Sequence, residues 1–432
     1  MKADVLLGLQ WGDEGKGKAV DVLAPSYEWI ARFQGGPNAG HTLWLDGKRI
    51  VLHTIPSGIF REECMNIIGN GVVIHPPSLL HEIKELRKHG LNLEGKLLIS
   101  AKAHLILPGH RLLDQAFESA KGDYKIGSTL RGIGPAYTDK YARHGLRYGD
   151  LVGPQGETLF QLAHDEHLRQ LKALRSELPL DIANQVREWL DTMAELLTDF
   201  APSDGSWLLN QALDSGQRVL AEGAQGSLLD VEFGAYPFVT SSHTTSAAAC
   251  TGLGIAPTRI GKVYGLFKAY CTRVGSGPFP TELLDETGDA LRSAGHEFGA
   301  TTGRPRRCGW LDLPALSYAI RLNGVHQLII TKADALSGFD EIKIAVRYQG
   351  LDHHQSPYPD RPTDCIPEYQ SFPGWKLSPN QSYSTRQQLP PSLQSYLSYL
   401  EDQLNLPIRW VSLGPERSQI LESQIDGTHA GI

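Results

Sequence analysis

Apolar and polar positions along the chain alternate between two patterns, one typical of buried strands and one typical of amphipathic helices. Short β-branched or apolar runs bounded by Gly, Pro and Asn recur from "DVLLGL" near the start to "IRWVSLG" near the end. Several runs are separated by apolar residues at helical spacing, as in "PPSLLHEIKELRKHG" and "LPALSYAIRLNG". This alternation is typical of a parallel sheet covered by helices. It predicts a single large α/β domain over residues 1–432, with a mostly parallel, twisted sheet.

Two stretches depart from this alternation. Residues 155–200 carry apolar positions at helical spacing and almost no strand pattern, which predicts a helical subdomain within the large domain. Residues 351–391 are rich in Pro, Ser, Gln and Tyr, which favours an irregular segment on the surface.

Charge and cysteine content narrow the classes of partner. Lys and Arg number 41 against 48 Asp and Glu, so the chain lacks the basic excess of a general nucleic-acid binder. The five cysteines are far apart and match neither a zinc spacing nor a disulfide framework. The apolar run at residues 5–9 is too short for a signal peptide, and no stretch is long enough to span a bilayer. We expect a soluble, cytoplasmic protein with no nucleic-acid and no membrane partner.

The stretch "DVLLGLQWGDEGKGKAVDVL", residues 4–23, has the form of a phosphate-binding loop with two anomalies. Gly12, Gly17 and Lys18 fit the G-x-x-x-x-G-K pattern, in which N–H groups at the start of a helix bind phosphate. Ala19 stands where the pattern has a hydroxyl that binds magnesium, and an Asp-Glu pair lies inside the loop. An ordinary glycine-rich turn before a helix explains this stretch equally well when it is taken alone.

Three further stretches combine small residues with groups that bind anions. "RFQGGPNAGHT", residues 32–42, presents Asn38 and His41 on a turn, although a surface turn with a lone His is the more common arrangement. "TLRGIGPAYTDKYARHGLR", residues 129–147, collects cationic side chains that fit a phosphate site or, more often, a solvated basic loop. "GATTGRPRRCGW", residues 299–310, is more specific, because crowded arginines repel one another unless an anion joins them.

Two apolar runs end in polar groups that suit a nucleotide base. "LIITKAD", residues 328–334, has the form of the T-K-x-D element that reads guanine in GTP-binding proteins, and "WVSLGPER", residues 410–417, ends similarly. In that element the Lys stem covers the base, and the carboxylate accepts from the ring N–H and the amino group. The motif is short and occurs by chance, but its place after a strand and downstream of a phosphate loop strengthens it.

Taken in order, nine motifs closely resemble those of the adenylosuccinate synthetase family over nearly the whole chain. They are "QWGDEGKGK", "NAGHT", "GIGPAYTDKYARHGLR", "EGAQGSLLD", "YPFVTSS", "TRVGSGPFPTE", "GATTGRPRRCGWLD", "TKAD" and "SLGPER". The resemblance implies a Mg²⁺-dependent ligase that joins IMP and L-aspartate at the expense of GTP in purine biosynthesis. It also implies a homodimer with a P-loop-like nucleotide site.

The implied chemistry explains the two anomalies of the opening loop. The 6-oxo group of IMP is a very poor leaving group, so the family transfers the γ-phosphoryl of GTP to that oxygen before the aspartate amine displaces phosphate. By resemblance Asp13 is both a Mg²⁺ ligand and the base that takes the N1 proton, and the carbonyl of Gly40 is the other protein ligand of the metal. His41 matches the acid that donates to phosphate oxygens.

The resemblance also assigns the binding residues one by one. The GTP contacts it implies are Gly12, Gly15, Lys16, Gly17, Lys18, Gly40, Thr42, Arg306, Lys332, Asp334, Ser412 and Gly414. The IMP contacts are Asp13, Lys16, Asn38, His41, Thr129, Gln225, Thr240 and Arg304, with Arg143 reaching the IMP phosphate of the neighbouring subunit. The aspartate site comprises Val274, Ala300, Thr301, Thr302 and Arg304.

The sequence departs from the family at a few positions and leaves two rival hypotheses. Leu130 replaces a glycine in "STLRGIGP", and His243 stands where Asn is common in "SSHTTSAAACTG". A GTP-binding switch protein would share the phosphate loop and T-K-x-D, but would give no role to Asp13 or His41 and would normally keep a hydroxyl at position 19. A different nucleotide-dependent ligase on the same architecture is the second rival.

Overall fold

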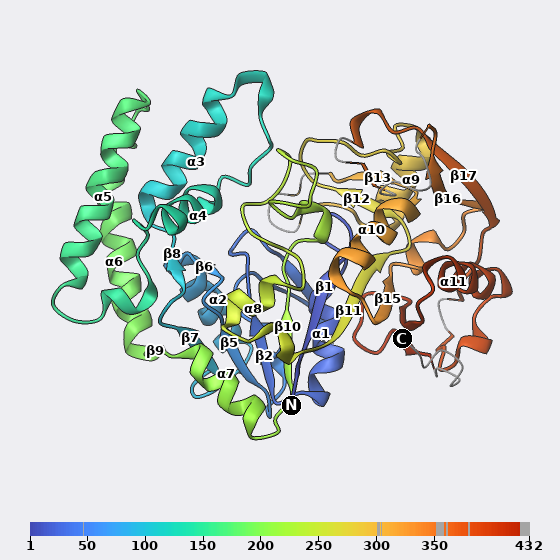
Figure 1. Cartoon of the computed structure of the whole chain (residues 1–432), viewed down its shortest axis with the longest axis horizontal. Helices are drawn as coiled ribbons and strands as arrows, with labels where there is room; N and C mark the ends of the chain where they lie inside the picture. Colours follow the sequence, from blue (N-terminus) through green and yellow to red (C-terminus); the bar gives the residue numbers. More distant parts are fainter. Residues whose placement is uncertain are drawn as a thin grey trace.

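The computed structural model describes residues 1–45, 47–299, 303, 305–350, 358–359, 362–378 and 381–423. In this part of the chain, ten strands form one twisted sheet through the middle of the molecule (Figure 1). In spatial order they are β19 (Ile420–Glu422), β18 (Ile408–Ser412), β15 (Gln327–Thr331), β11 (Ile260–Lys268), β1 (Ala3–Gly8), β10 (Val219–Glu222), β2 (Trp29–Arg32), β5 (Met65–Ile68), β7 (Leu97–Ser100) and β9 (Pro202–Ser203). The predicted large, mostly parallel sheet is confirmed.

The central strand β1 pairs in parallel with β10 on one side and β11 on the other, and the parallel pairing continues outward to β9 and to β18. β19 joins β18 antiparallel at the edge. Parallel strands require crossover connections, and helices supply most of them. They are α1 (Lys16–Leu23), α2 (Pro76–Lys88), α7 (Gly205–Asp214), α8 (Ala248–Leu253), α9 (Glu286–Ala294), α10 (Leu313–Asn323) and α11 (Pro391–Leu404).

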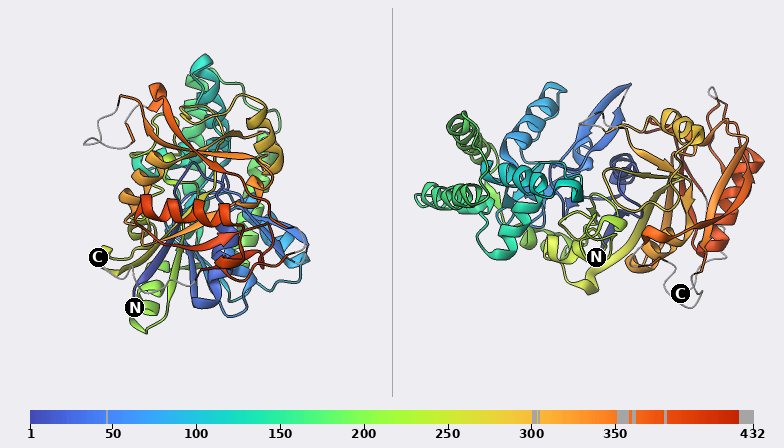
Figure 2. Two further views of the ribbon diagram at one scale, coloured as in Figure 1. Left: turned by 90° about the vertical axis from the view of Figure 1, so that its right-hand side faces the viewer. Right: turned by 90° about the horizontal axis from the view of Figure 1, so that it is seen from above.

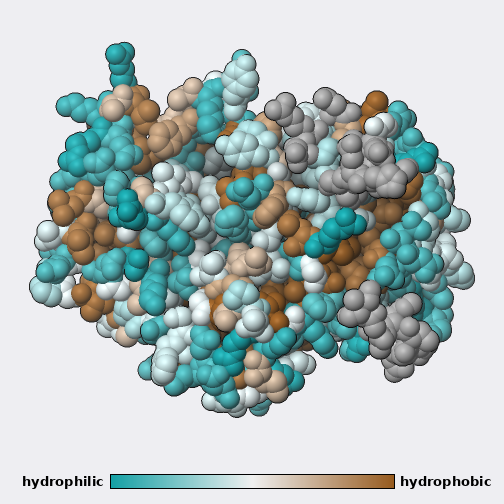
Figure 3. All heavy atoms as spheres, in the orientation of Figure 1, coloured by the Kyte–Doolittle hydropathy of each residue, from teal (hydrophilic) through white to brown (hydrophobic). Residues whose placement is uncertain are grey.

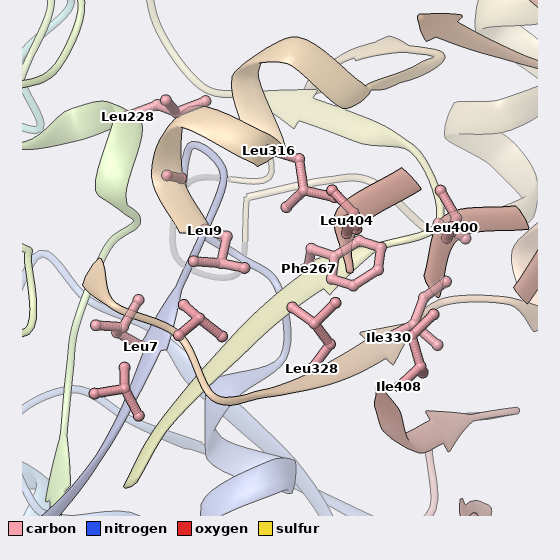
Figure 4. Packing of buried hydrophobic residues seen from close by; sticks show 14 of the residues in the cluster. Leu7, Leu9, Leu228, Phe267, Leu316, Leu328, Ile330, Leu400, Leu404 and Ile408 are labelled. Carbon is pink, nitrogen blue, oxygen red and sulfur yellow. The ribbon is translucent and has the colours of Figure 1, made fainter. Parts of the chain in front are cut away.

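Alternate residues of the central strands pack into hydrophobic cores on the two opposite faces of the sheet. Both faces are therefore apolar, which explains why the sequences of these strands are continuously apolar. Leu7 and Leu9 from β1 and the residue after it pack with Phe267, Leu328 and Ile330 on the face covered by α10 and α11 (Figure 4). The residues between them face the opposite side: Leu6, Leu266 and Ile329 pack against Val20 of α1. A strand buried on both faces has no room for the polar alternation of a surface strand.

The predicted helical subdomain consists of long helices at one end of the molecule. Figures 1 and 2 show α5 (Gly156–Ala173) and α6 (Ile182–Asp199) at the opposite end from β16 (Glu341–Tyr348), β17 (Pro367–Pro373) and α11. Trp189 and Leu196 of α6 are buried in a core shared with α2 and with α5. Beside these helices lie α3 (Pro108–Ala120) and α4 (Ile133–Ala142).

In the described residues, four smaller sheets lie outside the ten-stranded sheet. They are β3 (His41–Leu45) with β4 (Lys48–Leu52), β6 (Val73–Ile74) with β8 (His104–Leu105), β12 (Cys271–Arg273) with β13 (Arg307–Gly309), and β14 (Leu311–Asp312) with β16 (Glu341–Tyr348) and β17 (Pro367–Pro373). β17 lies inside the segment 351–391 that the sequence predicted to be irregular, so that prediction is wrong there. Its residues are exposed or half-buried and lie between two prolines, so its composition gives no strand signal. Antiparallel hydrogen bonding to β16 makes it a strand. Parts of 351–391 lie outside the described residues.

Across the described residues, no helix is long and apolar enough to cross a bilayer.

The fold predicts one glycine whose replacement should be costly. A β-carbon on Gly252, in α8, would lie 2.0 Å from the backbone oxygen of Phe33, so Gly252→Ala must push α8 off the end of β2. Overpacking against backbone costs typically 1–3 kcal/mol or more, so we expect a loss of about 3 kcal/mol in the free energy of unfolding, measured by urea titration. The matched control is Gly134→Ala in α4, where the nearest atom lies 3.5 Å away. That variant should gain up to about 1 kcal/mol; equal stability of the two would contradict the packing.

Candidate functional site

The loops that follow the central strands meet at the carboxyl edge of the sheet. The opening loop follows β1, "NAGH" precedes β3, "TKAD" follows β15 and "SLGPER" follows β18. Thr331 Oγ1 donates a hydrogen bond of 2.7 Å to the carbonyl of Glu14, which joins "TKAD" to the opening loop. A β-carbon on Gly17 would lie 2.9 Å from Cβ of His41, so α1 begins directly against "NAGHT". Ligands of open α/β sheets bind at this edge.

The opening loop turns on left-handed residues and enters α1 as predicted. Gly12 has φ +87° and Gly15, the residue before α1, has φ +93°, conformations that favour glycine. Glu14 is fully buried and accepts from the backbone N–H groups of Gln10 (3.1 Å) and Gly12 (2.9 Å) and from Lys16 Nζ (2.5 Å). This carboxylate therefore shapes the loop from inside and holds Lys16, and does not point at the space where phosphate would bind.

Asp13 is the loop carboxylate that faces the site. It has φ +59°, an uncommon conformation for a residue with a side chain, and its side chain is 30% exposed. Arg306 Nε lies 2.8 Å from its Oδ2, and Arg306 Nη1 donates to Glu297 Oε2 at 2.5 Å. Asp13 is therefore ionically paired with a cation that a second carboxylate holds in place.

Glu297 is fully buried and collects several cations. Lys268 Nζ donates to its Oε1 at 2.9 Å, and the Tyr270 hydroxyl donates to the same oxygen at 2.5 Å. Burial alone would raise the pKa of Glu297, but Lys268, Arg306 and Lys332 outweigh it and lower that pKa to about 2. The carboxylate thus stays ionised and fixes Arg306 opposite Asp13.

His41 lies across the site in a buried polar cluster. Its Nδ1 is 2.6 Å from Oε1 of Glu222; the Ser57 hydroxyl donates to the same oxygen, and the Ser57 backbone N–H donates to Oε2. Burial, and next the neighbouring Arg32, lower the pKa of His41 to about 4. Since the ionised Glu222 accepts from Nδ1, the neutral ring carries its proton on Nδ1 and turns a bare Nε2 toward the site.

Several buried polar atoms at this edge lack a hydrogen-bond partner. They are Oδ1 of Asn38, Nε2 of His41, and both Oε1 and Nε2 of Gln225. A β-carbon on Gly12 would lie 3.5 Å from Cα of Gln225, and one on Gly17 would lie 2.9 Å from Cβ of His41, so Gln225 and His41 border the opening loop and the start of α1. Buried polar atoms are nearly always paired in native proteins, and a group of unpaired ones indicates a place for a polar ligand.

Near "SLGPER", the side chain of Lys18 is bound to protein acceptors, whereas the lysine of a simple phosphate loop is directed at phosphate. Lys18 Nζ donates to Ser412 Oγ (2.9 Å) and to the carbonyls of Gly414 (2.7 Å) and Gln419 (3.0 Å). Lys18 therefore ties α1 to the loop after β18. Lys332, which has φ +62°, directs Nζ to the carbonyl of Gly295 at 2.7 Å, and Asp334 begins a short helical turn beside it.

The remaining predicted site residues lie in different parts of the molecule or outside the described residues. Thr129 lies exposed on the loop before α4, and Val274, 46% exposed, lies near it, since a β-carbon on Gly127 would be 3.3 Å from Cα of Gly275. Arg143 lies exposed at the far end of α4, away from Thr129 along the chain. Four more predicted residues lie outside the described residues: Ala300, Thr301, Thr302 and Arg304. Gly40, Thr42 and Thr240 are half-buried.

The departure at Leu130 has a visible consequence. Leu130 has φ +55°, a left-handed conformation in which glycine is favoured, and its side chain is 38% exposed. Its backbone N–H donates to Ser128 Oγ at 3.2 Å. The chain therefore keeps the turn despite the side chain.

Two buried carboxylates that hold residues of this site were not predicted from the sequence: Glu222 and Glu297. Glu222 ends the buried strand β10 in "VLAEG" and begins the motif "EGAQGSLLD", so the sequence offered two local signals, but neither assigned it a role. Glu297 follows α9 and has no local signal, because its partners come from β11 and from Arg306.

Comparisons with known proteins agree with one another. A family model described as adenylosuccinate synthetase matches residues 5–421. The adenylosuccinate synthetase of Flavobacterium johnsoniae is 53% identical over 424 residues, covering 98% of this chain and 100% of that protein, and that of Christiangramia forsetii is 52% identical over 423 residues with the same coverage. The structure of fully ligated adenylosuccinate synthetase from Plasmodium falciparum superposes with a TM-score of 0.90 at 36% identity, covering 98% of this chain and 100% of that one.

The lowered pKa of His41 predicts a pH dependence of stability. Between its ordinary pKa of 6.5 and about 4, the unfolded chain binds a proton that the folded chain refuses, so this contribution is present above pH 6.5 and lost as pH falls toward 4. From pH 7.5 to pH 5.5, above the range where most carboxylates titrate, wild type should lose about 1.3 kcal/mol more than His41→Asn. Urea titration of both proteins at both pH values measures the difference. Equal losses would mean that the ring titrates alike in both states.

Proposed function

The chain belongs to the adenylosuccinate synthetase family, and from that premise we propose which of its residues carry the reaction. The protein is a GTP-dependent carbon–nitrogen ligase of purine biosynthesis, and it forms adenylosuccinate from IMP and L-aspartate while GTP becomes GDP and phosphate. The observation that best supports the residue roles is that Asp13 and His41 are each paired with a charged side chain at one edge of the sheet, Asp13 with Arg306 and His41 with Glu222.

Asp13 is the base of the first step. It takes the N1 proton of IMP, and the 6-oxygen then attacks the γ-phosphoryl of GTP, which leaves GDP. In the free protein Arg306 Nε lies 2.8 Å from Oδ2 of this carboxylate. Since a carboxylate paired with Arg cannot accept a proton freely, Arg306 must turn from Asp13 to phosphate when the nucleotides bind.

His41 stabilises the charge that moves toward GDP. Its Nε2 has no partner within the protein, and Glu222 behind it favours a second proton on the ring once a polyanion lies against Nε2. Asn38, Gln225, Thr129 and Thr240 bind IMP in this scheme.

Mg²⁺ is the metal of the reaction in this proposal. The Asp13 carboxylate and the Gly40 carbonyl would hold it, and hard oxygen donors of this kind are the ligands that Mg²⁺ prefers. Bound there, the ion would neutralise charge on the transferring phosphoryl group. Because Asp13 supplies the protein carboxylate, the loop does not need a hydroxyl at Ala19.

In the second step the aspartate amine displaces phosphate from C6 of the phosphorylated IMP. Val274 and the residues Ala300, Thr301, Thr302 and Arg304 form the aspartate site, with the guanidinium of Arg304 on a carboxylate. Guanine is read by Lys332 and Asp334, with Ser412 and Gly414 beside it and Lys18 holding their loop through 2.7 and 2.9 Å bonds.

The protein works as a cytoplasmic homodimer in this proposal, and Arg143 reaches the IMP phosphate of the neighbouring subunit. Arg143 is exposed, and Tyr141 beside it is 68% exposed, as expected of a surface that another subunit covers. Figure 3 shows apolar patches over the helical end of the molecule, at the left. Cys64, Cys250, Cys271 and Cys308 are free thiols, which suits the reducing cytoplasm.

The direct test of the activity is an absorbance assay for adenylosuccinate with each of IMP, L-aspartate, GTP and Mg²⁺ omitted in turn. We expect product only when all four are present. GTP hydrolysis that continues without IMP and aspartate would favour a switch-type GTPase instead.

Base choice should depend on Asp334. Asp334→Asn turns one acceptor into a donor that faces the guanine donors, and each unpaired buried polar group costs about 1–3 kcal/mol or more, so kcat/KM for GTP should fall about 100-fold. Xanthosine triphosphate carries a carbonyl in place of the amino group, accepts from the new amide and should become the better substrate. The measurement is kcat/KM for both triphosphates in both proteins. An unchanged preference for GTP would place guanine recognition elsewhere.

Mixing two inactive variants tests the role of Arg143 across the dimer. Arg143→Leu and Asp13→Ala subunits should each be inactive as homodimers, because each lacks one group in both sites. After subunit exchange, each heterodimer has one site with an intact Asp13 from one chain and an intact Arg143 from the other, so activity should return in part. Exchange is verified by tagged subunits; verified exchange without recovery would assign Arg143 to its own chain's site.

A further inference from the structure

A buried His-Asp-His cluster joins three helices outside the site. Asp139 of α4 accepts at Oδ2 from Nε2 of His110, on α3, at 2.9 Å and from Nε2 of His167, on α5, at 2.8 Å. Both histidines are 1% exposed, and their rings lie 4.3 Å apart. A β-carbon on Gly109 would lie 2.5 Å from Cβ of His167, so α5 approaches α3 as closely as glycine allows.

The ring atoms of this cluster suit hydrogen bonding better than metal binding. The backbone N–H of Leu107 donates to Nδ1 of His110 at 3.0 Å, which leaves the proton of the neutral ring on Nε2. A metal on Nε2 would require that proton on Nδ1, facing another N–H. Burial lowers the pKa of His110 to about 4, so the ring is neutral near pH 7. The hydrogen bonds from the two histidines outweigh burial and hold the pKa of Asp139 well below its usual range.

The cluster fixes the end of α4, where Arg143 lies. The carbonyl of Asp139 accepts from the backbone N–H groups of His144 (2.9 Å) and Gly145 (3.1 Å), which close the turn around Arg143. Arg143 itself has φ +68°, so this corner needs support from outside the helix. Asp139 lies one helical turn before Arg143, and its side chain and backbone both belong to this support.

The same helix α3 holds the other end of α4 through different residues. Asp114 Oδ2 accepts from the backbone N–H of Gly132 and its Oδ1 from the hydroxyl of Ser128, both at 2.8 Å. Since His110 and Asp114 are four residues apart, they lie on one face of α3. One face therefore supports the Thr129 loop through Asp114 and the Arg143 corner through His110.

We propose that Asp139, clamped by His110 and His167, is a positioning residue for the neighbouring subunit's IMP site, because it holds the corner that presents Arg143. The inference rests on the proposed function, in which Arg143 serves the neighbour. Asp114, in contrast, positions Thr129 for the site of its own chain. Asp139 and Asp114 of one chain therefore support different active sites of the dimer.

Asp139→Ala should raise KM for IMP by about 10-fold or more, with KM for GTP within 2-fold and the far-ultraviolet circular dichroism spectrum unchanged. Asp139→Asn keeps an oxygen that accepts from both rings and should stay within 3-fold of wild type for IMP. A merely structural role would change all kinetic constants together. Equal KM values for IMP in Asp139→Ala and wild type would overturn the proposal.

Hybrid dimers give the decisive test. In Asp139→Ala mixed with Asp13→Ala, the intact Asp13 receives Arg143 from the chain with an intact clamp, so KM for IMP should return to the wild-type value. In Asp114→Ala mixed with Asp13→Ala, the active site keeps its own damaged Thr129 loop, so KM should stay raised.

A KM that stays raised in the Asp139→Ala hybrid, while Arg143→Leu with Asp13→Ala recovers activity, would overturn this inference and leave the proposed function intact. If neither mixture recovers, supply of Arg143 across the dimer fails, and the inference fails with it.

Discussion

Three fully buried carboxylates at the carboxyl edge of the sheet set the geometry of the site, because each holds a group with a proton or positive charge to offer. Glu14 holds Lys16, Glu222 holds His41 and Glu297 holds Arg306. A carboxylate without exposure is costly unless it is paired and hydrogen-bonded, and each of the three also accepts from backbone N–H groups, hydroxyls or a second cation. In the free protein each pair therefore holds both the carboxylate and its partner side chain in one position.

This arrangement resolves the apparent contradiction of a phosphate-binding loop that contains acidic residues. Glu14 lies inside the loop and orders it, and Asp13 faces outward in an ion pair with Arg306. The cradle is therefore close to neutral before nucleotides arrive, and its cations are already in place for them. In the proposed function the triphosphate displaces these pairs and Arg306 leaves Asp13, so nucleotide binding would itself free the carboxylate to act as the base.

Much of the fold was predictable from the sequence, because the parallel strands are buried on both faces and appear as unbroken apolar runs such as "DVLLGL" and "LIIT". The strand β17 was not predicted, since "PEYQSFP" does not alternate polar and apolar residues and is bounded by prolines, so only its pairing with β16 identifies it as a strand. The motifs located Asp13 and His41, but the partner of His41 lies 181 residues away, and no local pattern encodes that distance. Lys18 fits a phosphate-loop lysine by sequence, and its acceptors lie 394 to 401 residues later.

The most direct test of the account is a crystal structure of the protein with GDP, IMP and Mg²⁺ compared with the free protein. We predict that Lys16 Nζ and Arg306 Nε leave Glu14 and Asp13, from which they lie 2.5 and 2.8 Å in the free protein, and bind phosphate oxygens. The 2.6 Å contact between His41 Nδ1 and Glu222 should remain. A complex in which Arg306 still pairs with Asp13, with the metal and N1 of IMP bound elsewhere, would contradict the central claim.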